Sequence, residues 1–310
     1  MKSRFIKDTG LTARMTLVMF LLGALFVALI VALMFVGVTY FDGGMGLVVV
    51  IGLIGIGIAF YQWYASDKLA MRAMRAREVS PQEAPELHGM IDRLCALADM
   101  PKPRVGVADM AMPNAFATGR SPDRAVVCVT TGILHTLDAE ELEAVLAHEL
   151  SHVAHRDVMV MTIASTAGIV AGMVTQGARF GVFFGGGRGR NNQGTAVAFL
   201  AALVVSLVVY AISFFLTRLL SRYRELSADR AGAHLTMKPA ALASALQKIS
   251  GGIAQIPQKD LRSNAAMNAF FITPAVSGQT LKTLTSTHPP LEQRLEQLAR
   301  IQAELGRPRG

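Results

Sequence analysis

The chain has 310 residues, of which 52% are hydrophobic, and its mean hydropathy is +0.41. A soluble domain rarely averages so apolar, and long uncharged runs produce the value here, which excludes an ordinary soluble protein. The formal net charge is +8, but no nucleic-acid-binding motif accompanies it. We therefore assign the basic residues to membrane topology and expect no nucleic-acid partner.

Two apolar runs near the N-terminus are each long enough to cross a bilayer. Met15–Tyr40 and Met45–Tyr64 contain no charged residue, and each reaches the roughly 20 residues that cross a hydrocarbon core. A signal peptide is the alternative for the first run, but the run is too long and no convincing cleavage site follows it. Lys and Arg residues flank the pair on its outer sides. By the positive-inside trend, the N-terminus and the region after Tyr64 are cytoplasmic.

The region after the second run combines helical and β-like patterns. The basic stretch Lys68–Arg77 is typical of a helical exit from the membrane, and Ser80–Glu83 resembles the start of an amphipathic helix that ends before Pro101. Three β-like runs follow, at Arg104–Ala108, Ala115–Thr118 and Ala125–Thr131. We expect these runs to form a small antiparallel sheet.

A capping box at Asp138–Glu141 predicts the start of the next helix, because an acidic cap with Glu three residues later satisfies the free N–H groups. This helix is expected to run with little interruption into a third apolar run, Val158–Ala178. A Gly-rich connector leads to a fourth run, Thr195–Thr217, and then to the helical pattern of Arg218–His234. On the sequence alone, the third and fourth runs either span the membrane or form a re-entrant hairpin.

The predicted helix carries the sequence His148-Glu149-Leu150-Ser151-His152. Residues four apart lie on one helix face, so both imidazoles can bind a single metal ion. Glu149 is displaced around the helix, where it can hold a water molecule beside the metal. Zinc lowers the pKa of such a water, and the carboxylate takes its proton during attack on a carbonyl. The competing interpretation is two solvated histidines on an ordinary helix.

A catalytic zinc site needs a third protein ligand, and Glu225 is the candidate. Asp229 follows one turn later on the same face, where it can orient a ligand imidazole through the other ring N–H. On spacing alone, a surface charge pattern with Arg222 and Arg230 would be the favoured interpretation of both acids.

The chain resembles the HtpX-like branch of the membrane zinc metalloproteases, a family that also includes the CAAX prenyl proteases. The resemblance covers nearly the whole chain and rests on separated blocks in matching order. The blocks are Met112–Gly119, Glu143–His152, Arg224–Asp229 and Thr287–Arg294.

This resemblance implies roles for particular residues. His148, His152 and Glu225 match the ligands of one zinc ion per chain, and Glu149 matches the catalytic base. An edge strand that holds extended substrate backbone matches Asn114, Ala115, Phe116 and Ala117. His288 and Arg294 match a block near the active site and are candidates to stabilise the developing oxyanion, with a structural role for Arg294 as the alternative. His155 departs from the family pattern, and we interpret it as a polar residue near the site.

The expected fold is mainly α, with membrane helices and a gluzincin-like α+β metalloprotease domain. Four segments are predicted. Residues 1–65 form a membrane hairpin, 66–157 carry the first part of the protease domain, 158–217 form a second membrane hairpin, and 218–310 carry the third zinc ligand.

The function implied is a zinc-dependent endopeptidase of the bacterial inner membrane, with a cytoplasmic catalytic domain that cleaves misfolded or damaged membrane proteins. Its expected partners are membrane-protein substrates and the lipid bilayer, and other quality-control proteases of the membrane are candidates. Self-cleavage in the Gly-rich connector is also expected.

Three other functions would leave different features in the sequence. An intramembrane protease would place the motif inside an apolar span, whereas acidic residues precede the motif here and Arg156-Asp157 follow it. A scaffold or chaperone would be expected to lose Glu149 or a ligand. A zinc transporter would place its ligands in the middle of spans.

Overall fold

The computed structural model describes residues 9–40, 44–184, 192–254 and 288–306. These divide into two compact units, one from Met1–Ala13, Tyr64–Met159 and Ser221–Gly310 and the other from Arg14–Trp63 and Val160–Leu220. The predicted Gly-rich connector and the expected self-cleavage site lie largely outside the described residues.

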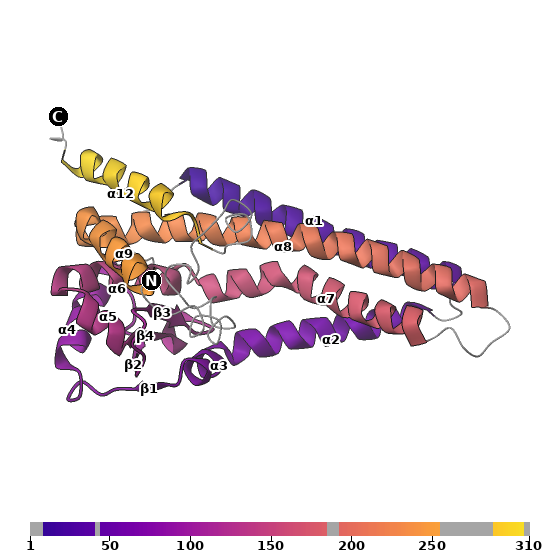
Figure 1. Cartoon of the computed structure of the whole chain (residues 1–310), viewed down its shortest axis with the longest axis horizontal. Coiled ribbons are helices and arrows are strands. Elements are labelled where there is room, and N and C mark those ends of the chain that lie inside the picture. The colour runs from indigo at the N-terminus through magenta and orange to yellow at the C-terminus, as the bar shows by residue number, and fades with distance from the viewer. Residues whose placement is uncertain (1–8, 41–43, 185–191, 255–287, 307–310) are drawn as a thin grey trace. The chain divides into compact units, whose positions relative to one another are not determined.

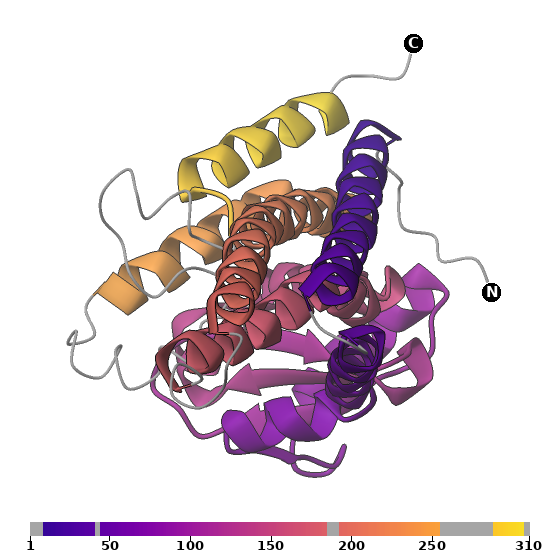
Figure 2. The ribbon, with the colours of Figure 1, turned by 90° about the vertical axis from the view of Figure 1, so that its right-hand side faces the viewer.

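The second unit consists of long apolar helices. It contains most of α1 (Thr9–Tyr40), α2 (Gly44–Tyr64), α7 (Asp157–Phe184) and α8 (Asn192–Thr236), which run side by side within the unit (Figures 1 and 2). Among the described residues, three stretches are long and apolar enough to cross a membrane: Thr9–Phe35, Asp157–Gly177 and Leu200–Thr236. The predicted helices at the first, third and fourth apolar runs are therefore confirmed, and the second run is also helical.

These helices pack through small and branched side chains. Leu29 of α1, Val170 of α7 and Val209 of α8 belong to one buried cluster. A methyl group built on Gly55 of α2 would lie 2.4 Å from Cγ2 of Val170, so α2 approaches α7 closely at this point. Close approach at small residues is typical of helix packing in membranes, where dispersion forces and not the exclusion of water hold helices together.

The first unit contains a sheet of four strands in the order β1-β2-β4-β3. The strands are β1 (Ala76–Glu78), β2 (Arg104–Ala108), β3 (Ala115–Thr118) and β4 (Val126–Thr130). β1 pairs with β2 and β3 pairs with β4 in antiparallel fashion, but β2 and β4 are parallel. β3 is therefore an edge strand beside the buried β4.

The prediction of an antiparallel sheet was wrong for this central pair. β3 turns back at the edge of the sheet, so β4 enters between β3 and β2 and runs in the direction of β2. β1 was not predicted at all. Helix α3 (Ser66–Ala73) ends early, and Arg75, with φ of 50°, turns the chain into this short strand.

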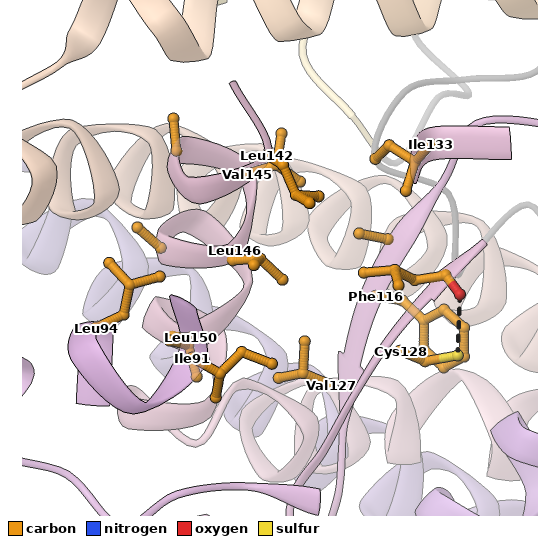
Figure 3. Packing of buried hydrophobic residues seen from close by; sticks show 14 of the residues in the cluster. Ile91, Leu94, Phe116, Val127, Cys128, Ile133, Leu142, Val145, Leu146 and Leu150 are labelled. Atoms are coloured by element: carbon orange, nitrogen blue, oxygen red, sulfur yellow. Dashed lines mark hydrogen bonds between the residues drawn. The ribbon is translucent and has the colours of Figure 1, made fainter. Parts of the chain in front are cut away.

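Helices α4 (Pro85–Ala98), α5 (Thr131–Thr136), α6 (Ala139–Ala154), α9 (Pro239–Ala254) and α12 (Leu291–Leu305) complete this unit. The predicted helix start at Ser80–Glu83 was wrong, because this stretch is a turn in which the Ser80 N–H donates to the Glu83 carboxylate. The core lies where α4 and α6 meet the sheet. Figure 3 shows Ile91, Leu146 and Val127 pointing toward one another, and all three are fully buried.

Both ends of α6 are fixed by local chemistry. Asp138 and Glu141 form the predicted capping box, with backbone-to-carboxylate distances of 2.9 and 3.0 Å. At the other end the helix stops at Ala154, and Arg156 adopts a left-handed conformation with φ of 55° before α7 begins at Asp157. The expected continuation of α6 into the third apolar run is therefore interrupted by a sharp corner.

Candidate metal centre

The two histidines of the motif lie on one face of α6, as their spacing predicts. Nε2 of His148 and Nε2 of His152 are 3.2 Å apart, and the rings meet edge to face. Glu225 approaches from α8, with Oε1 3.4 Å from Nε2 of His152 and Oε2 3.7 Å from Nε2 of His148. One donor atom from each residue lies within 4.8 Å of the others. The three side chains could therefore hold one metal ion.

The distances between these donors fit a tetrahedral ion. Ligand atoms about 2.0–2.2 Å from zinc and separated by tetrahedral angles lie about 3.3–3.6 Å from each other. The two histidine nitrogens are 3.2 Å apart, and each has a different oxygen of Glu225 nearby, Oε1 3.4 Å from His152 and Oε2 3.7 Å from His148, so each of these separations is close to this range. Two imidazoles and one carboxylate also match the three-ligand set that leaves a fourth position for water in catalytic zinc sites.

Asp229 is placed to orient His148, as the sequence suggested. Oδ1 of Asp229 lies 2.9 Å from Nδ1 of His148, on the side of the ring opposite the candidate metal position. Burial alone would lower the pKa of His148, but Asp229 and Glu225 outweigh it and raise that pKa to about 10. Arg294 holds Asp229 from α12 through two hydrogen bonds, from Nε at 2.7 Å and Nη2 at 2.6 Å.

His152 has a matching arrangement that the sequence analysis missed. Nδ1 of His152 lies 2.5 Å from Oδ2 of Asp157, and Nη2 of Arg224 lies 2.6 Å from the same oxygen. Asp157 and Arg224 are both buried. The available signals were an acid five residues after the second histidine and an arginine directly before Glu225, but neither pattern says that the two residues meet.

Glu149 is buried beside the candidate ligands. Removal from water raises the pKa of this carboxyl, while His148, His152 and a hydrogen bond from the Ala117 backbone act in the opposite direction. The net shift is upward, which favours a group that can accept a proton near neutral pH. The Ala117 contact also places the carboxylate next to β3, the edge strand.

The predicted substrate-binding stretch divides into two parts. Ala115, Phe116 and Ala117 lie in β3, whose outer side is a sheet edge. Asn114 precedes the strand, and its backbone is already bonded to Thr130: its N–H donates to the Thr130 hydroxyl, and its C=O accepts from the Thr130 N–H. β3 has β4 on one side only, so another strand could pair along its outer edge, whereas both backbone groups of Asn114 are already bonded to Thr130.

The last block of the predicted site also reaches the centre. Nδ1 of His288 lies 3.1 Å from Oε2 of Glu225, and Nη1 of Arg294 lies 3.7 Å from the same oxygen. Every charged residue that the sequence analysis singled out for the site is therefore found there. His155, which departs from the family pattern, is the C-cap of α6 and does not belong to the group of candidate ligands.

A glycine sets the distance between the two metal-bearing helices. A methyl group built on Gly232 of α8 would lie 2.9 Å from the backbone N of His148 and 3.1 Å from its Cα. These are backbone atoms of α6 and cannot give way as a flexible side chain would. Gly232 therefore permits α8 to approach α6 closely enough for Glu225 to meet the histidines.

Comparison with known proteins gives concordant matches over most of the chain. Residues 81–302 match the model of peptidase family M48. Protease HtpX homolog 1 of Streptomyces coelicolor is 54% identical over 307 residues, which cover 99% of this chain and 97% of that protein. The protease HtpX homolog of Moorella thermoacetica is 49% identical over 306 residues, which cover 98% and 99%.

A solved structure shares the fold. The crystal structure of Ste24p from S. mikatae is similar with a TM-score of 0.55 at 18% identity, over 80% of this chain and 57% of that one. At this identity, the likeness concerns the fold alone.

Proposed function

This chain belongs to peptidase family M48 and is a membrane metalloprotease, and from that premise we propose its chemistry, its substrates and its side of the membrane. In this proposal it is a zinc-dependent endopeptidase that cleaves misfolded or damaged membrane proteins at the cytoplasmic face of the bacterial inner membrane. It acts on stretches of those proteins that are exposed outside the bilayer.

One observation carries the chemical part of the proposal: three donors of the right type converge, with a buried carboxylate beside them. His148, His152 and Glu225 would hold one zinc ion per chain, because their donor atoms are separated as the ligands of a tetrahedral ion are. Glu149 follows His148 directly, so it is rotated about 100° around the helix and faces the space beside the ion.

When bound, zinc supplies Lewis-acid chemistry, because it lowers the pKa of a coordinated water and polarises a carbonyl oxygen. The protein residues do the rest. Glu149 takes the proton from the attacking water and can return it to the leaving amine, and its raised pKa suits both transfers. Asp229 and Arg294 keep the ring of His148 turned toward the ion.

His288 is proposed to hold the ligand carboxylate or to donate to the developing oxyanion. Its position 3.1 Å from Glu225 supports both roles. Arg294 is better suited to holding Asp229 and Glu225 in place, because two of its nitrogens already donate to Asp229. The alternative structural role that the sequence left open for Arg294 is the one that these contacts support.

Substrate is proposed to bind as an added strand. The edge strand β3, which contains Ala115, Phe116 and Ala117, would pair with the substrate backbone, and the backbone of Ala117 already contacts Glu149. Pairing through the main chain makes little demand on side-chain identity, which suits an enzyme that degrades unfolded segments of many proteins.

The position of the zinc site relative to the membrane is inferred from the helices that carry the candidate ligands. The candidate span of α7 begins at Asp157, five residues after His152, and Glu225 lies in α8, which also contains the apolar stretch from Leu200. The zinc site would then lie near the membrane surface, because only five positions separate His152 from the start of the α7 span. The basic flanks of the first two spans support a cytoplasmic location.

The test compares the detergent-purified full chain with Glu149→Gln, with and without zinc, on casein as an unfolded substrate. We expect zinc-dependent cleavage by the wild type and loss of cleavage in the variant, with its zinc content unchanged. Glu140→Gln is the matched control, because Glu140 lies on the same helix but is exposed, and within the described part of the chain it pairs with Lys238. Zinc binding without cleavage by the wild type would favour a metal-stabilised scaffold instead.

The membrane placement needs a separate experiment. A membrane protein with an unstable cytoplasmic loop is reconstituted together with the protease, and the cleavage sites are mapped by mass spectrometry. Cuts should fall in segments outside the bilayer on the cytoplasmic side. Cuts within the spans, or on the opposite side, would contradict the proposed placement without affecting the zinc chemistry.

A further inference from the structure

The second histidine of the motif is held by a pair of charged residues outside the predicted site. Nδ1 of His152 points away from the candidate metal position and lies 2.5 Å from Asp157. Arg224 contacts the same carboxylate oxygen at 2.6 Å. The side chains of Asp157 and Arg224 are only 5% and 9% exposed, so the interaction takes place largely out of water.

The corner between α6 and α7 makes this contact possible. In an unbroken helix, a residue five positions after His152 would be rotated by about 140° from it and would face another side. The left-handed backbone of Arg156 breaks the helix and brings Asp157, the first residue of α7, against the ring. The conformation of Arg156 thus determines where the Asp157 carboxylate lies.

Arg224 is needed because a buried carboxylate without a partner is costly. It comes from α8 and directly precedes Glu225, so one helix segment provides both the third candidate ligand and the cation that holds Asp157. Among the residues that the structure describes, Nε of Arg224 has no hydrogen-bond partner. Arg224 contacts Asp157 through Nη2, whereas Arg294 contacts Asp229 through both Nε and Nη2.

We infer that Asp157 and Arg224 are a positioning pair for His152. Asp157 accepts the Nδ1–H of the ring, which keeps the lone pair on Nε2 and directs it toward the ion, and Arg224 fixes the carboxylate in place. The inference rests on the zinc site of the proposed function. It gives each ligand histidine its own carboxylate and arginine, and it ties the start of α7 to the geometry of the centre.

The experiment measures zinc affinity of the full chain in detergent by competition with a chromophoric chelator, for Asp157→Asn, Asp157→Ala and Arg224→Gln. Loss of such an outer partner typically weakens metal binding 10- to 100-fold. We expect about tenfold for Asp157→Asn, which keeps an acceptor oxygen, and about 100-fold for Asp157→Ala. With zinc saturating, kcat should fall while KM for casein changes little, because the pair does not touch substrate.

Two further variants separate positioning from mere stability. Glu141→Gln removes the charge of a buried carboxylate on α6 that pairs with Lys248, away from the candidate ligands, so it should leave zinc affinity unchanged. Arg224→Lys should restore most of the affinity lost in Arg224→Gln, because a single-point contact can be made by an ammonium group. In the Asp157→Asn background, Arg224→Gln should add little further loss, since the arginine acts through the aspartate.

The outcomes are distinguishable. A wild type that binds no zinc would contradict the proposed function itself. A wild type that binds zinc, with Asp157→Asn and Arg224→Gln within twofold of it, would overturn the positioning pair alone. If Asp157→Ala does not fold, the other variants still decide, and replacement of zinc by Co²⁺ gives an independent readout: the visible absorption bands should shift in Asp157→Asn and not in Glu141→Gln.

Discussion

Replacement of Gly232 by alanine tests the close approach of α8 to α6 that brings the candidate ligands together. The added methyl group would lie 2.9 Å from N and 3.1 Å from Cα of His148, and 3.2 Å from the carbonyl carbon of Ala147. Ordinary contacts of this kind are 3.4–4 Å. The two helices would therefore have to separate by about 0.5 Å, because backbone atoms cannot rotate away as side chains do.

The magnitude follows from two opposing terms. Alanine gains about 1 kcal/mol over glycine in a helix interior, whereas overpacking against a rigid neighbour costs about 1–3 kcal/mol. Gly89→Ala is the matched control, because Gly89 lies in α4 with open space around it and shows only the gain. Gly232→Ala should therefore be less stable than Gly89→Ala by about 1–3 kcal/mol. For a chain of 310 residues this corresponds to a melting temperature lower by about 1.5–5 °C.

The displacement should also reach the metal centre. Glu225 precedes Gly232 by seven residues, almost two helical turns, so both face α6. Gly232→Ala is expected to weaken zinc binding by about tenfold, and Gly89→Ala should leave it unchanged. Thermal unfolding and chelator competition on detergent-purified protein measure the two effects. If Gly232→Ala melted above the wild type and bound zinc normally, the packing of α8 on α6 described here would be wrong.

Three further predictions concern ionisation. Burial alone would raise the pKa of Glu141, but hydrogen bonds, foremost that from Lys248, keep this pKa below the ordinary 4.5. The ionised carboxylate therefore stabilises the fold above pH 4.5, and this stabilisation is lost as pH falls through the lowered pKa of the folded state. Glu141→Gln should therefore cost about 1–3 kcal/mol at pH 7 and progressively less as pH falls below 4.5, and a melting deficit that does not shrink as pH falls would contradict this. Burial raises the pKa of Cys95 to about 11 and that of Cys128 to about 12, so neither thiol should react with Ellman's reagent at pH 8 until the protein is unfolded, when two should be titrated. Neighbouring carboxylates raise the pKa of His148 to about 10, so below that pH zinc must displace a proton from the ring in order to bind. Zinc affinity should therefore rise roughly tenfold per pH unit from pH 7 to 9, and an affinity that stays constant above pH 7 would refute the raised pKa.

Local patterns in the sequence predicted local structure well. The capping box at Asp138 and Glu141 depends only on groups three residues apart, and it forms as expected. The strand Arg104–Ala108 was also predicted with its correct limits, because its apolar residues and flanking turn residues are contiguous. The pair His148 and His152 follows from helix periodicity alone.

Features that depend on distant residues were not accessible in this way. The parallel pairing of β2 with β4 is decided by where β3 turns back, and nothing in either strand encodes its neighbour. The contact of Asp157 with Arg224 joins residues 67 positions apart across a corner made by one left-handed residue. Glu225 was singled out as a ligand mainly through family resemblance, because its spacing from other charges is also typical of a solvated helix face.

The corner at Arg156 has a consequence for comparing sequences. Only residues 155 and 156 separate Asp157 from the end of α6, so an insertion or deletion there would change where the Asp157 carboxylate lies relative to His152. The number of residues in this corner is thus as restricted as the spacing of the two histidines. In other chains with the same motif, two features would indicate the same geometry: an aspartate five positions after the second histidine, and an arginine directly before the glutamate that is the third candidate ligand.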